Sequence, residues 1–147
     1  MTDKRRNAPN EKAAAVEREN EATVLRYIEG WTTMDADKII SCLHDDIAYM
    51  VYVGGPTYEG KDKIHEVVTA FFKNWKKIEF DVKRMSIMGN VTMHERAEDY
   101  HGVEGQEDWH FHVTSLLVFK DGKIIIWRDY GTPGEVPLFG SLLFSPS

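Results

Sequence analysis

A short stretch of alternating charged residues, at positions 94–99, has the spacing needed for acid–base chemistry. Its sequence is His-Glu-Arg-Ala-Glu-Asp. If this stretch is a strand, His94, Arg96 and Glu98 share one face, because side chains alternate across a strand. The Cα atoms of Arg96 and Glu98 are then roughly 6.6 Å apart, which is close enough for a charge-assisted hydrogen bond between their side chains.

A second acid, Asp129, lies near the end of the last predicted strand, in the sequence Trp-Arg-Asp-Tyr at 127–130. We expect it to share a face with Ile125 and Trp127. A carboxyl beside a tryptophan on a pocket face is desolvated, so its pKa should rise. Two acids bridged by Arg96 could then divide the work, one activating water as a base and the other donating a proton.

The same charged residues have a simpler interpretation. Charged side chains on a strand face usually form a solvated outer surface, where ion pairs add little to stability. Perturbed ionisation marks functional sites only as a statistical tendency. Composition alone therefore leaves catalysis and a solvated strand face as open alternatives.

Two histidines, His110 and His112, flank Phe111 and form a His-x-His pair. Such a pair makes a usable metal site only where a third ligand is in place. By alternation both histidines face away from Phe111, Val113 and Ser115, and therefore away from the apolar face that we assign to a pocket. We expect them at the surface or at a dimer interface, and the sequence predicts no metal site.

Helices are predicted in the first half of the chain. Apolar residues take helical spacing from Glu21, and Asp35 is a suitable N-cap for a short helix over 36–43. Apolar residues at three-and-four spacing predict a strongly amphipathic helix over 60–75. Residues 1–20 are polar and charged, and we expect them to form a partly flexible extension.

Strands dominate the second half. Residues rich in β-branched and aromatic side chains predict strands at 47–53, 78–88, 91–101, 109–119 and 123–130. Hairpin turn signals are the Gly-Asn pair at 89–90 and the stronger Asp-Gly pair at 121–122. This order indicates a single α+β domain over residues 21–147, with helices on one side of a mostly antiparallel sheet.

The composition narrows the class of protein. The 147 residues carry 18 Lys and Arg against 24 Asp and Glu, a net charge of −6, so nothing indicates nucleic-acid binding. The hydrophobic content of 42% is enough for a packed core. No apolar run approaches the roughly 20 residues of a membrane-spanning helix, and no apolar segment follows the basic N-terminal residues. We expect a cytoplasmic protein without a membrane anchor.

The single cysteine, Cys42, excludes an intrachain disulfide and a cysteine-rich zinc site. This is typical of a protein from a reducing compartment. Its neighbours Ile39 and Leu43 indicate that Cys42 is a packing residue.

Both faces of the last predicted strand are largely apolar. Alternation places Ile124 and Ile126 on one face and Ile125 and Trp127 on the other. One face can cover the helices and a pocket, and the other needs a second cover, for which a second subunit is the simplest. We therefore expect a homodimer. The final segment, 133–147, is predicted to fold over the pocket mouth, to contact the partner subunit, or to fray.

Several of these features together resemble one enzyme family. They are the helical N-terminal half, Tyr49, the Glu-Arg-Ala-Glu sequence at 95–98, the Asp-Gly-Lys turn at 121–123 and the Trp-Arg-Asp-Tyr sequence at 127–130. The chain resembles the limonene-1,2-epoxide hydrolase family, which belongs to the NTF2-like superfamily with SnoaL-type polyketide cyclases and ketosteroid isomerases. The resemblance implies a cystatin-like cone, in which a curved, mostly antiparallel sheet wraps around N-terminal helices, and it implies catalysis without a cofactor.

The resemblance also implies residue roles. Asp129 would be the base that activates water, and Tyr49 would help to position that water. Arg96 would bridge the two acids, and Glu98, where the family has Asp, would protonate the epoxide oxygen. Val51 stands where the family has the Asn that holds the water.

The implied substrate is a small hydrophobic epoxide of terpenoid, steroid or polyketide-like type. The expected pocket residues are Trp31, Val51, Phe72, Phe111, Val113, Ser115 and Trp127. A SnoaL-like cyclase, isomerase or dehydratase could use the same acids to move protons. A non-catalytic module that binds an apolar ligand is a third hypothesis, although a buried charge cluster is costly without a use.

Overall fold

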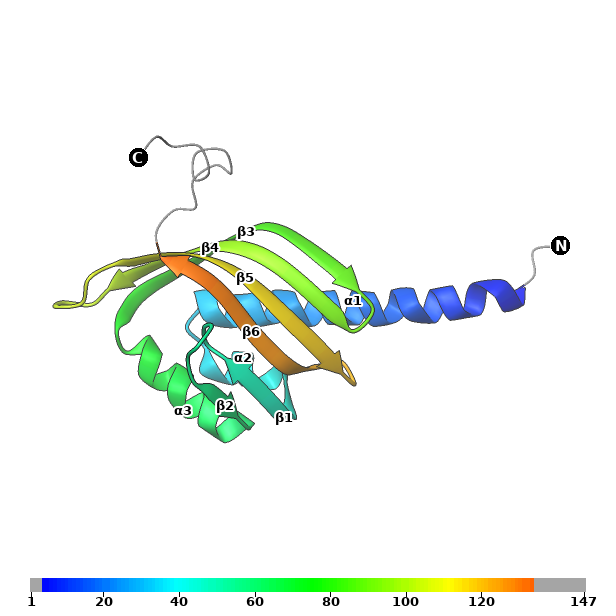
Figure 1. Ribbon diagram of the computed structural model, residues 1–147, viewed down its shortest axis with the longest axis horizontal. Coiled ribbons are helices and arrows are strands. Elements are labelled where there is room, and N and C mark those ends of the chain that lie inside the picture. The colour runs from blue at the N-terminus through cyan, green and yellow to red at the C-terminus, as the bar shows by residue number, and fades with distance from the viewer. Residues whose placement is uncertain (1–3, 134–147) are drawn as a thin grey trace.

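The computed structural model describes residues 4–133, which form three helices and one six-stranded sheet (Figure 1). The elements in chain order are α1 (Lys4–Thr32), α2 (Ala36–Ser41), β1 (Leu43–Met50), β2 (Thr57–Glu59), α3 (Lys61–Phe72), β3 (Trp75–Met88), β4 (Val91–Gly102), β5 (Trp109–Lys120) and β6 (Lys123–Pro133). The predicted final segment 133–147 lies, beyond its first residue, outside the described residues.

The sheet has the strand order β2-β1-β6-β5-β4-β3. Neighbouring strands are antiparallel except for β1 and β6, which run parallel. The sheet curves strongly, and the helices lie on its concave side (Figure 1). The predicted α+β architecture with a curved, mostly antiparallel sheet is therefore confirmed.

The helices bury one side each against this concave face. In α1 the buried apolar residues Val24, Tyr27 and Trp31 recur every three or four positions, which places them on one stripe of the helix. The predicted N-cap of α2 is present, since Asp35 Oδ1 accepts a hydrogen bond from the backbone N–H of Lys38 at 2.9 Å. Helix α3 ends at Phe72, earlier than predicted, and Trp75 begins β3 instead.

Both predicted hairpin turns are confirmed. Met88 pairs with Val91 across the first turn, and Lys120 pairs with Lys123 across the second. At the second turn Asp121 has φ 51° and Gly122 has φ 73°. Positive φ at both central residues is the geometry that matches the twist of two-residue hairpins, and it explains why Asp-Gly is the stronger signal.

The predicted alternation fails at one place in β6. Phe119 pairs with Ile124 and Val118 with Ile126, so Ile125 is an extra residue in a β-bulge. The bulge turns Ile124 onto the buried inner face, where alternation alone would have placed Ile125. The strand regains its expected alternation from Ile126, so Asp129 still faces inward.

The predicted strand at 47–53 is also displaced. Strand β1 ends at Met50, so Val51 and Tyr52 lie in the following loop. The chain then returns as the short strand β2, which pairs with β1 at the edge of the sheet and was not predicted. Cys42 is fully buried, in agreement with its predicted packing role.

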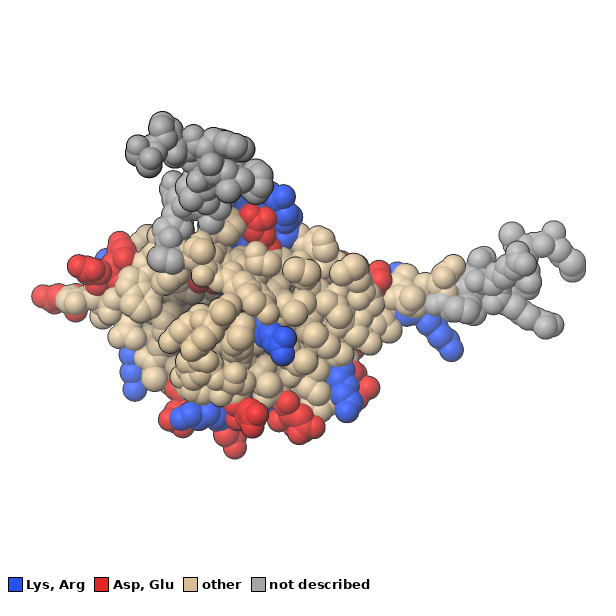
Figure 2. All heavy atoms as spheres, in the orientation of Figure 1, with Lys and Arg blue, Asp and Glu red and all other residues tan. Residues whose placement is uncertain are grey.

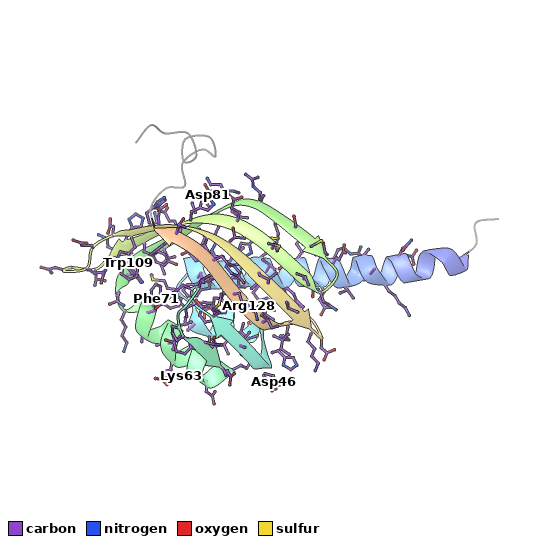
Figure 3. The ribbon with its side chains drawn as sticks, in the orientation of Figure 1. Asp46, Lys63, Phe71, Asp81, Trp109 and Arg128 are labelled. Atoms are coloured by element: carbon purple, nitrogen blue, oxygen red, sulfur yellow. The ribbon has the colours of Figure 1, made fainter. Side chains whose placement is uncertain are left out.

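Aromatic side chains cluster at one end of the concave side, and charged side chains lie at the periphery. Phe71 and Trp109 lie close together at one end, where their ring centroids are 6.5 Å apart, whereas Asp46, Lys63 and Asp81 lie at the periphery (Figure 3). Charged side chains of both signs gather along the edges of the face shown in Figure 2. No helix within residues 4–133 is long and apolar enough to cross a membrane.

Candidate active site

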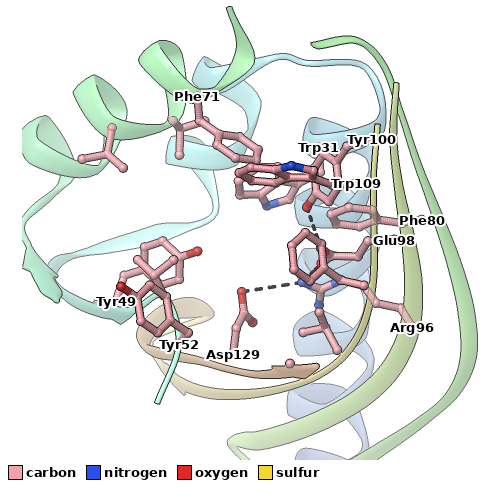
Figure 4. Close-up of a pocket in the computed structure, with 16 residues that line it drawn as sticks. Trp31, Tyr49, Tyr52, Phe71, Phe80, Arg96, Glu98, Tyr100, Trp109 and Asp129 are labelled. Atoms are coloured by element: carbon pink, nitrogen blue, oxygen red, sulfur yellow. Dashed lines mark hydrogen bonds and ion pairs between the residues drawn. The ribbon is translucent and has the colours of Figure 1, made fainter. Parts of the chain in front are cut away.

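A cavity of about 500 Å³ lies between the concave face of the sheet and helices α1 and α3. Eight aromatic rings line most of it, and the polar groups at its wall are few (Figure 4). The aromatic residues are Trp31, Tyr49, Tyr52, Phe71, Phe80, Tyr100, Trp109 and Phe111. A largely apolar cavity with a few convergent polar groups is the usual form of a small-molecule site.

Arg96 is the centre of the polar wall. Its Nε donates to Glu98 Oε1 at 2.7 Å, and its Nη2 lies 2.5 Å from the same oxygen. The same Nη2 lies 3.6 Å from Asp129 Oδ2 (Figure 4). These three residues are 1%, 5% and 8% exposed, so the alternative of a solvated strand face does not apply to them.

Ser115 links the arginine to the second acid. Arg96 Nη1 donates to Ser115 Oγ at 2.5 Å, and the Ser115 hydroxyl donates in turn to Asp129 Oδ1. The sheet register explains this contact, since Ser115 on β5 lies opposite His94 on β4 and opposite Asp129 on β6. Trp127 Nε1 adds a second donor to Asp129 Oδ1 at 3.0 Å.

Two more residues of β4 complete the network. The Tyr100 hydroxyl donates to Glu98 Oε2 at 2.6 Å. On the other side, His94 Nε2 lies 2.7 Å from Arg96 Nη1. An arginine has no acceptor, so His94 must accept through Nε2 and carry its hydrogen on Nδ1. His94, Arg96, Glu98 and Tyr100 are alternate residues of one strand, which is why they share a face.

Burial sets the charges of this network. It raises the pKa of Asp129 above its ordinary value, and the Arg96 charge offsets this only in part. Burial and the Arg96 charge lower the pKa of His94 from 6.5 to about 3. For Arg96 itself, burial alone would lower the pKa, but the Glu98 and Asp129 carboxylates raise it above its ordinary value. At neutral pH the arginine is therefore charged and His94 is neutral.

Aromatic side chains hold the network in place. The rings of Tyr49 and Trp127 stack with centroids 3.6 Å apart and an interplanar angle of 19°. Arg96 Cζ lies 4.6 Å from the centre of the Phe80 ring, a distance typical of a cation–π contact. Burial and the nearby Asp129 raise the pKa of Tyr49, so its phenol is neutral.

The structure brings all four predicted catalytic residues to this one cavity, since Tyr49, Arg96, Glu98 and Asp129 line it. Four of the predicted pocket residues line it as well: Trp31, Val51, Phe111 and Val113.

The other three predicted pocket residues lie behind the lining. Trp127 is fully buried beneath the Tyr49 ring, and Ser115 is covered between Arg96 and Asp129. Phe72 packs edge-on against Trp31, with ring centroids 5.3 Å apart. Helix α3 turns the preceding residue, Phe71, toward the cavity instead.

Sequence reasoning missed Tyr100 and several aromatic residues of the wall. Tyr100 had a usable signal, because it continues the alternation of His94, Arg96 and Glu98 by one step. Tyr52 had none, since it reaches the cavity from a loop.

The histidine pair lies on the opposite face of the sheet, as alternation predicted. His110 Nδ1 lies 2.5 Å from Asp99 Oδ1, and His112 Nε2 lies 2.7 Å from Glu95 Oε1. Within the part of the chain that the structure describes, no three His, Cys, Asp or Glu side chains form a group that could hold a metal ion.

Comparisons with known proteins agree with this architecture. A family model described as a SnoaL-like domain matches residues 24–127. The structure of an LEH-like epoxide hydrolase from M. tuberculosis is similar, with a TM-score of 0.69 and 22% identity, over 79% of this chain and 84% of that one.

Two further solved structures share the fold. One is a proposed SnoaL-like polyketide cyclase from Jannaschia sp. CCS1, with a TM-score of 0.69 and 17% identity, over 79% of this chain and 87% of that one. The other is a protein with a ketosteroid isomerase-like fold from Catenulispora acidiphila, solved in complex with trimethylamine. Its TM-score is 0.66 and its identity 16%, over 74% of this chain and 83% of that one.

Proposed function

We propose that this chain, which belongs to the SnoaL-like domain family, is a cofactor-independent epoxide hydrolase acting on a small hydrophobic substrate. One observation carries the proposal. A single buried guanidinium, that of Arg96, contacts the carboxyls of both Glu98 and Asp129 at the wall of an aromatic-lined cavity. Charged groups are costly to bury in such a wall, and an acid–base pair gives them a use.

Paired acids suit the opening of an epoxide. One carboxyl, in its ionised form, takes a proton from a water molecule whose oxygen attacks a ring carbon. The C–O bond breaks with its electron pair on the ring oxygen, which takes a proton from the other carboxyl. The product is a vicinal diol, and Arg96 keeps the two carboxyls in one fixed arrangement.

The lining of the cavity supports the substrate class. Aromatic faces and edges surround the space on α1, α3, β1 and the inner face of the sheet. Such walls favour an apolar molecule whose hydrocarbon body occupies this cavity of about 500 Å³ and whose oxygen points to the polar wall around Arg96. Terpenoid, steroid or polyketide-like epoxides meet this description.

The decisive test is hydrolysis of a panel of such epoxides in H₂¹⁸O. We expect a diol that carries one solvent oxygen, and we expect Asp129→Asn to lower kcat/KM by about 100-fold or more. Asp99→Asn is the matched control, because this aspartate lies on the outer face of β4 and pairs with His110. Full activity in Asp129→Asn, with an unchanged circular dichroism spectrum, would remove Asp129 from the reaction.

A second candidate function follows from Val51. This residue lines the cavity, where the resembling family has the Asn that holds water. An apolar side chain there favours proton-transfer chemistry that needs no attacking water, as in a SnoaL-like cyclase, isomerase or dehydratase. A product that contains no ¹⁸O would support this alternative. Tight binding of apolar ligands without any turnover would instead support a non-catalytic binding protein.

The proposal includes a cytoplasmic homodimer. On the outer face of the sheet a groove with largely apolar walls lies over β1, β2 and β6, with Ala48, Met50, Val53 and Ile126 among its residues. A second subunit would cover it. Sedimentation or size-exclusion measurements that give only a monomer at micromolar concentration would contradict this part of the proposal.

A further inference from the structure

We propose that this chain reverses the division of labour that the family resemblance implies: Asp129 donates the proton from Oδ2, and Glu98 is the base that accepts a proton from water. The assignment rests on the proposed acid–base function of the cavity. It follows from which oxygen of each carboxyl is already occupied by a hydrogen-bond donor, and from the balance of charge around Arg96.

The two oxygens of Asp129 have different surroundings. Oδ1 accepts hydrogen bonds from the Ser115 hydroxyl and from Trp127 Nε1. Two donors on one oxygen leave it no room for a proton, so a protonated Asp129 carries its hydrogen on Oδ2. Within the described residues Oδ2 has only the 3.6 Å contact with Arg96 Nη2, and Asp129 lines the cavity. The proton of Asp129 is therefore the one that a ligand can reach.

Glu98 is the carboxyl that lies closest to the Arg96 charge. Both Nε and Nη2 of Arg96 contact its Oε1, at 2.7 Å and 2.5 Å, and the Tyr100 hydroxyl donates to its Oε2. Asp129 also accepts from two donors, so the difference between the two carboxyls lies in Arg96, whose nitrogens are 2.5 and 2.7 Å from Glu98 but 3.6 Å from Asp129. The shorter contacts to Arg96 also make Glu98, rather than Asp129, the main counter-ion of the guanidinium. Oε2 keeps a second lone pair for a water molecule.

The other titratable groups around Asp129 do not change this balance. They come from α1, β1 and β4, and they are Tyr27, Tyr49, His94, Arg96, Glu98 and Tyr100. Burial keeps the three phenols and His94 neutral. One positive charge, on Arg96, then faces one negative charge, on Glu98, and the second carboxyl retains its proton.

The reaction balances with these roles. The water oxygen bonds to a ring carbon while its proton passes to Glu98 Oε2. The ring C–O bond breaks, and the oxygen that receives the electron pair takes the proton from Asp129 Oδ2. The turnover leaves Glu98 protonated and Asp129 ionised, and exchange with solvent restores the starting state. Ser115 and Tyr100 are positioning residues, because each acts through the carboxyl to which it donates.

The first test reads the protonation state of the whole protein without substrate. Infrared spectra near neutral pH are compared for protein labelled with ¹³C in the side-chain carboxyls of Asp alone or of Glu alone. We expect a buried carboxylic-acid band that shifts only with labelled Asp, that is absent in Asp129→Asn and that persists in Asp99→Asn. A band that shifts with labelled Glu, or no such band at all, would overturn the assignment.

The second test uses the pH profile of kcat/KM. Ser115→Ala removes a donor from Asp129, which favours the protonated form, so the alkaline limb should move up by about one pH unit. Tyr100→Phe removes a donor from Glu98 and leaves the contacts of Asp129 intact, so kcat should fall while the alkaline limb stays in place. An alkaline limb that moves in Tyr100→Phe, or that stays in place in Ser115→Ala, refutes the assignment.

The two tests separate two kinds of failure. If no epoxide is turned over, the proposed function fails, while the infrared result still decides which carboxyl holds the proton.

Discussion

His94 gives a quantitative prediction about stability and pH. The residue is 1% exposed, and burial together with the adjacent Arg96 charge lowers its pKa from 6.5 to about 3. The unfolded chain binds a proton at this histidine below pH 6.5, and the folded chain does not until about pH 3. Folding stability due to His94 is therefore complete above pH 6.5 and falls as the pH drops from 6.5 toward 3.

The magnitude follows from the same shift. Each pH unit below 6.5 costs about 1.4 kcal/mol, so at pH 5 the wild type loses about 2 kcal/mol relative to pH 7.5 through this residue alone. The variant His94→Gln keeps an acceptor for Arg96 and has no group that titrates. Its free energy of unfolding should fall less between these two pH values, by about 2 kcal/mol.

Urea unfolding at pH 7.5 and pH 5, followed by tryptophan fluorescence, measures this difference. His65→Gln is the control, because His65 is an exposed histidine of α3 that pairs with Asp37, and we expect it to follow the wild type. Equal pH dependence in wild type and His94→Gln would refute the reasoning. So would an NMR titration that places the pKa of His94 above 5.

Three further variants test the wall of the cavity and its support. Val51→Asn restores the amide with which the resembling family holds water beside the acid at position 129. With Glu98 as the base, the variant should change the rate of diol formation less than about 2-fold, whereas a rise of about 10-fold would identify Asp129 as the base. Phe80→Leu removes the ring 4.6 Å from Arg96 Cζ, and urea unfolding should show a loss of about 1–2 kcal/mol. Gly102→Ala places a Cβ 2.0 Å from the backbone oxygen of Gln106, and thermal unfolding should show a loss of about 1–3 kcal/mol.

The sequence was sufficient to predict the polar wall of the cavity because β4 is regular. Alternation along one unbroken strand places Arg96 and Glu98 on a common face, and the register with β5 and β6 then brings Ser115 and Asp129 beside them. The turn residues Asp121 and Gly122 contributed as well, because their positive φ angles define a two-residue hairpin and so fix how β5 and β6 align.

Two features could not be predicted from the sequence because they depend on contacts between elements: the bulge in β6 and the side of α3 that faces the cavity. Residues 124–126 are all isoleucine, so no polar residue marks which face each side chain takes, and only the pairing with Phe119 and Val118 reveals the bulge at Ile125. The direction of α3 is a similar case. Phe71 and Phe72 have equal hydrophobicity and both pack against Trp31, so only the placement of α3 on the sheet decides that Phe71 faces the cavity.

The surroundings of Asp129 Oδ2 favour a catalytic cavity over a cavity that only binds an apolar ligand. A binding cavity would be at least as stable with apolar side chains in place of Arg96, Glu98 and Asp129. Here each of the other polar atoms of these three side chains has a close partner, either within the trio or in Ser115, Trp127, Tyr100 or His94. Among the described residues, the one polar contact of Asp129 Oδ2 is with Arg96 Nη2, at 3.6 Å. A carboxyl oxygen without a close donor, at the wall of a cavity that is otherwise aromatic, fits a group that passes a proton to a substrate.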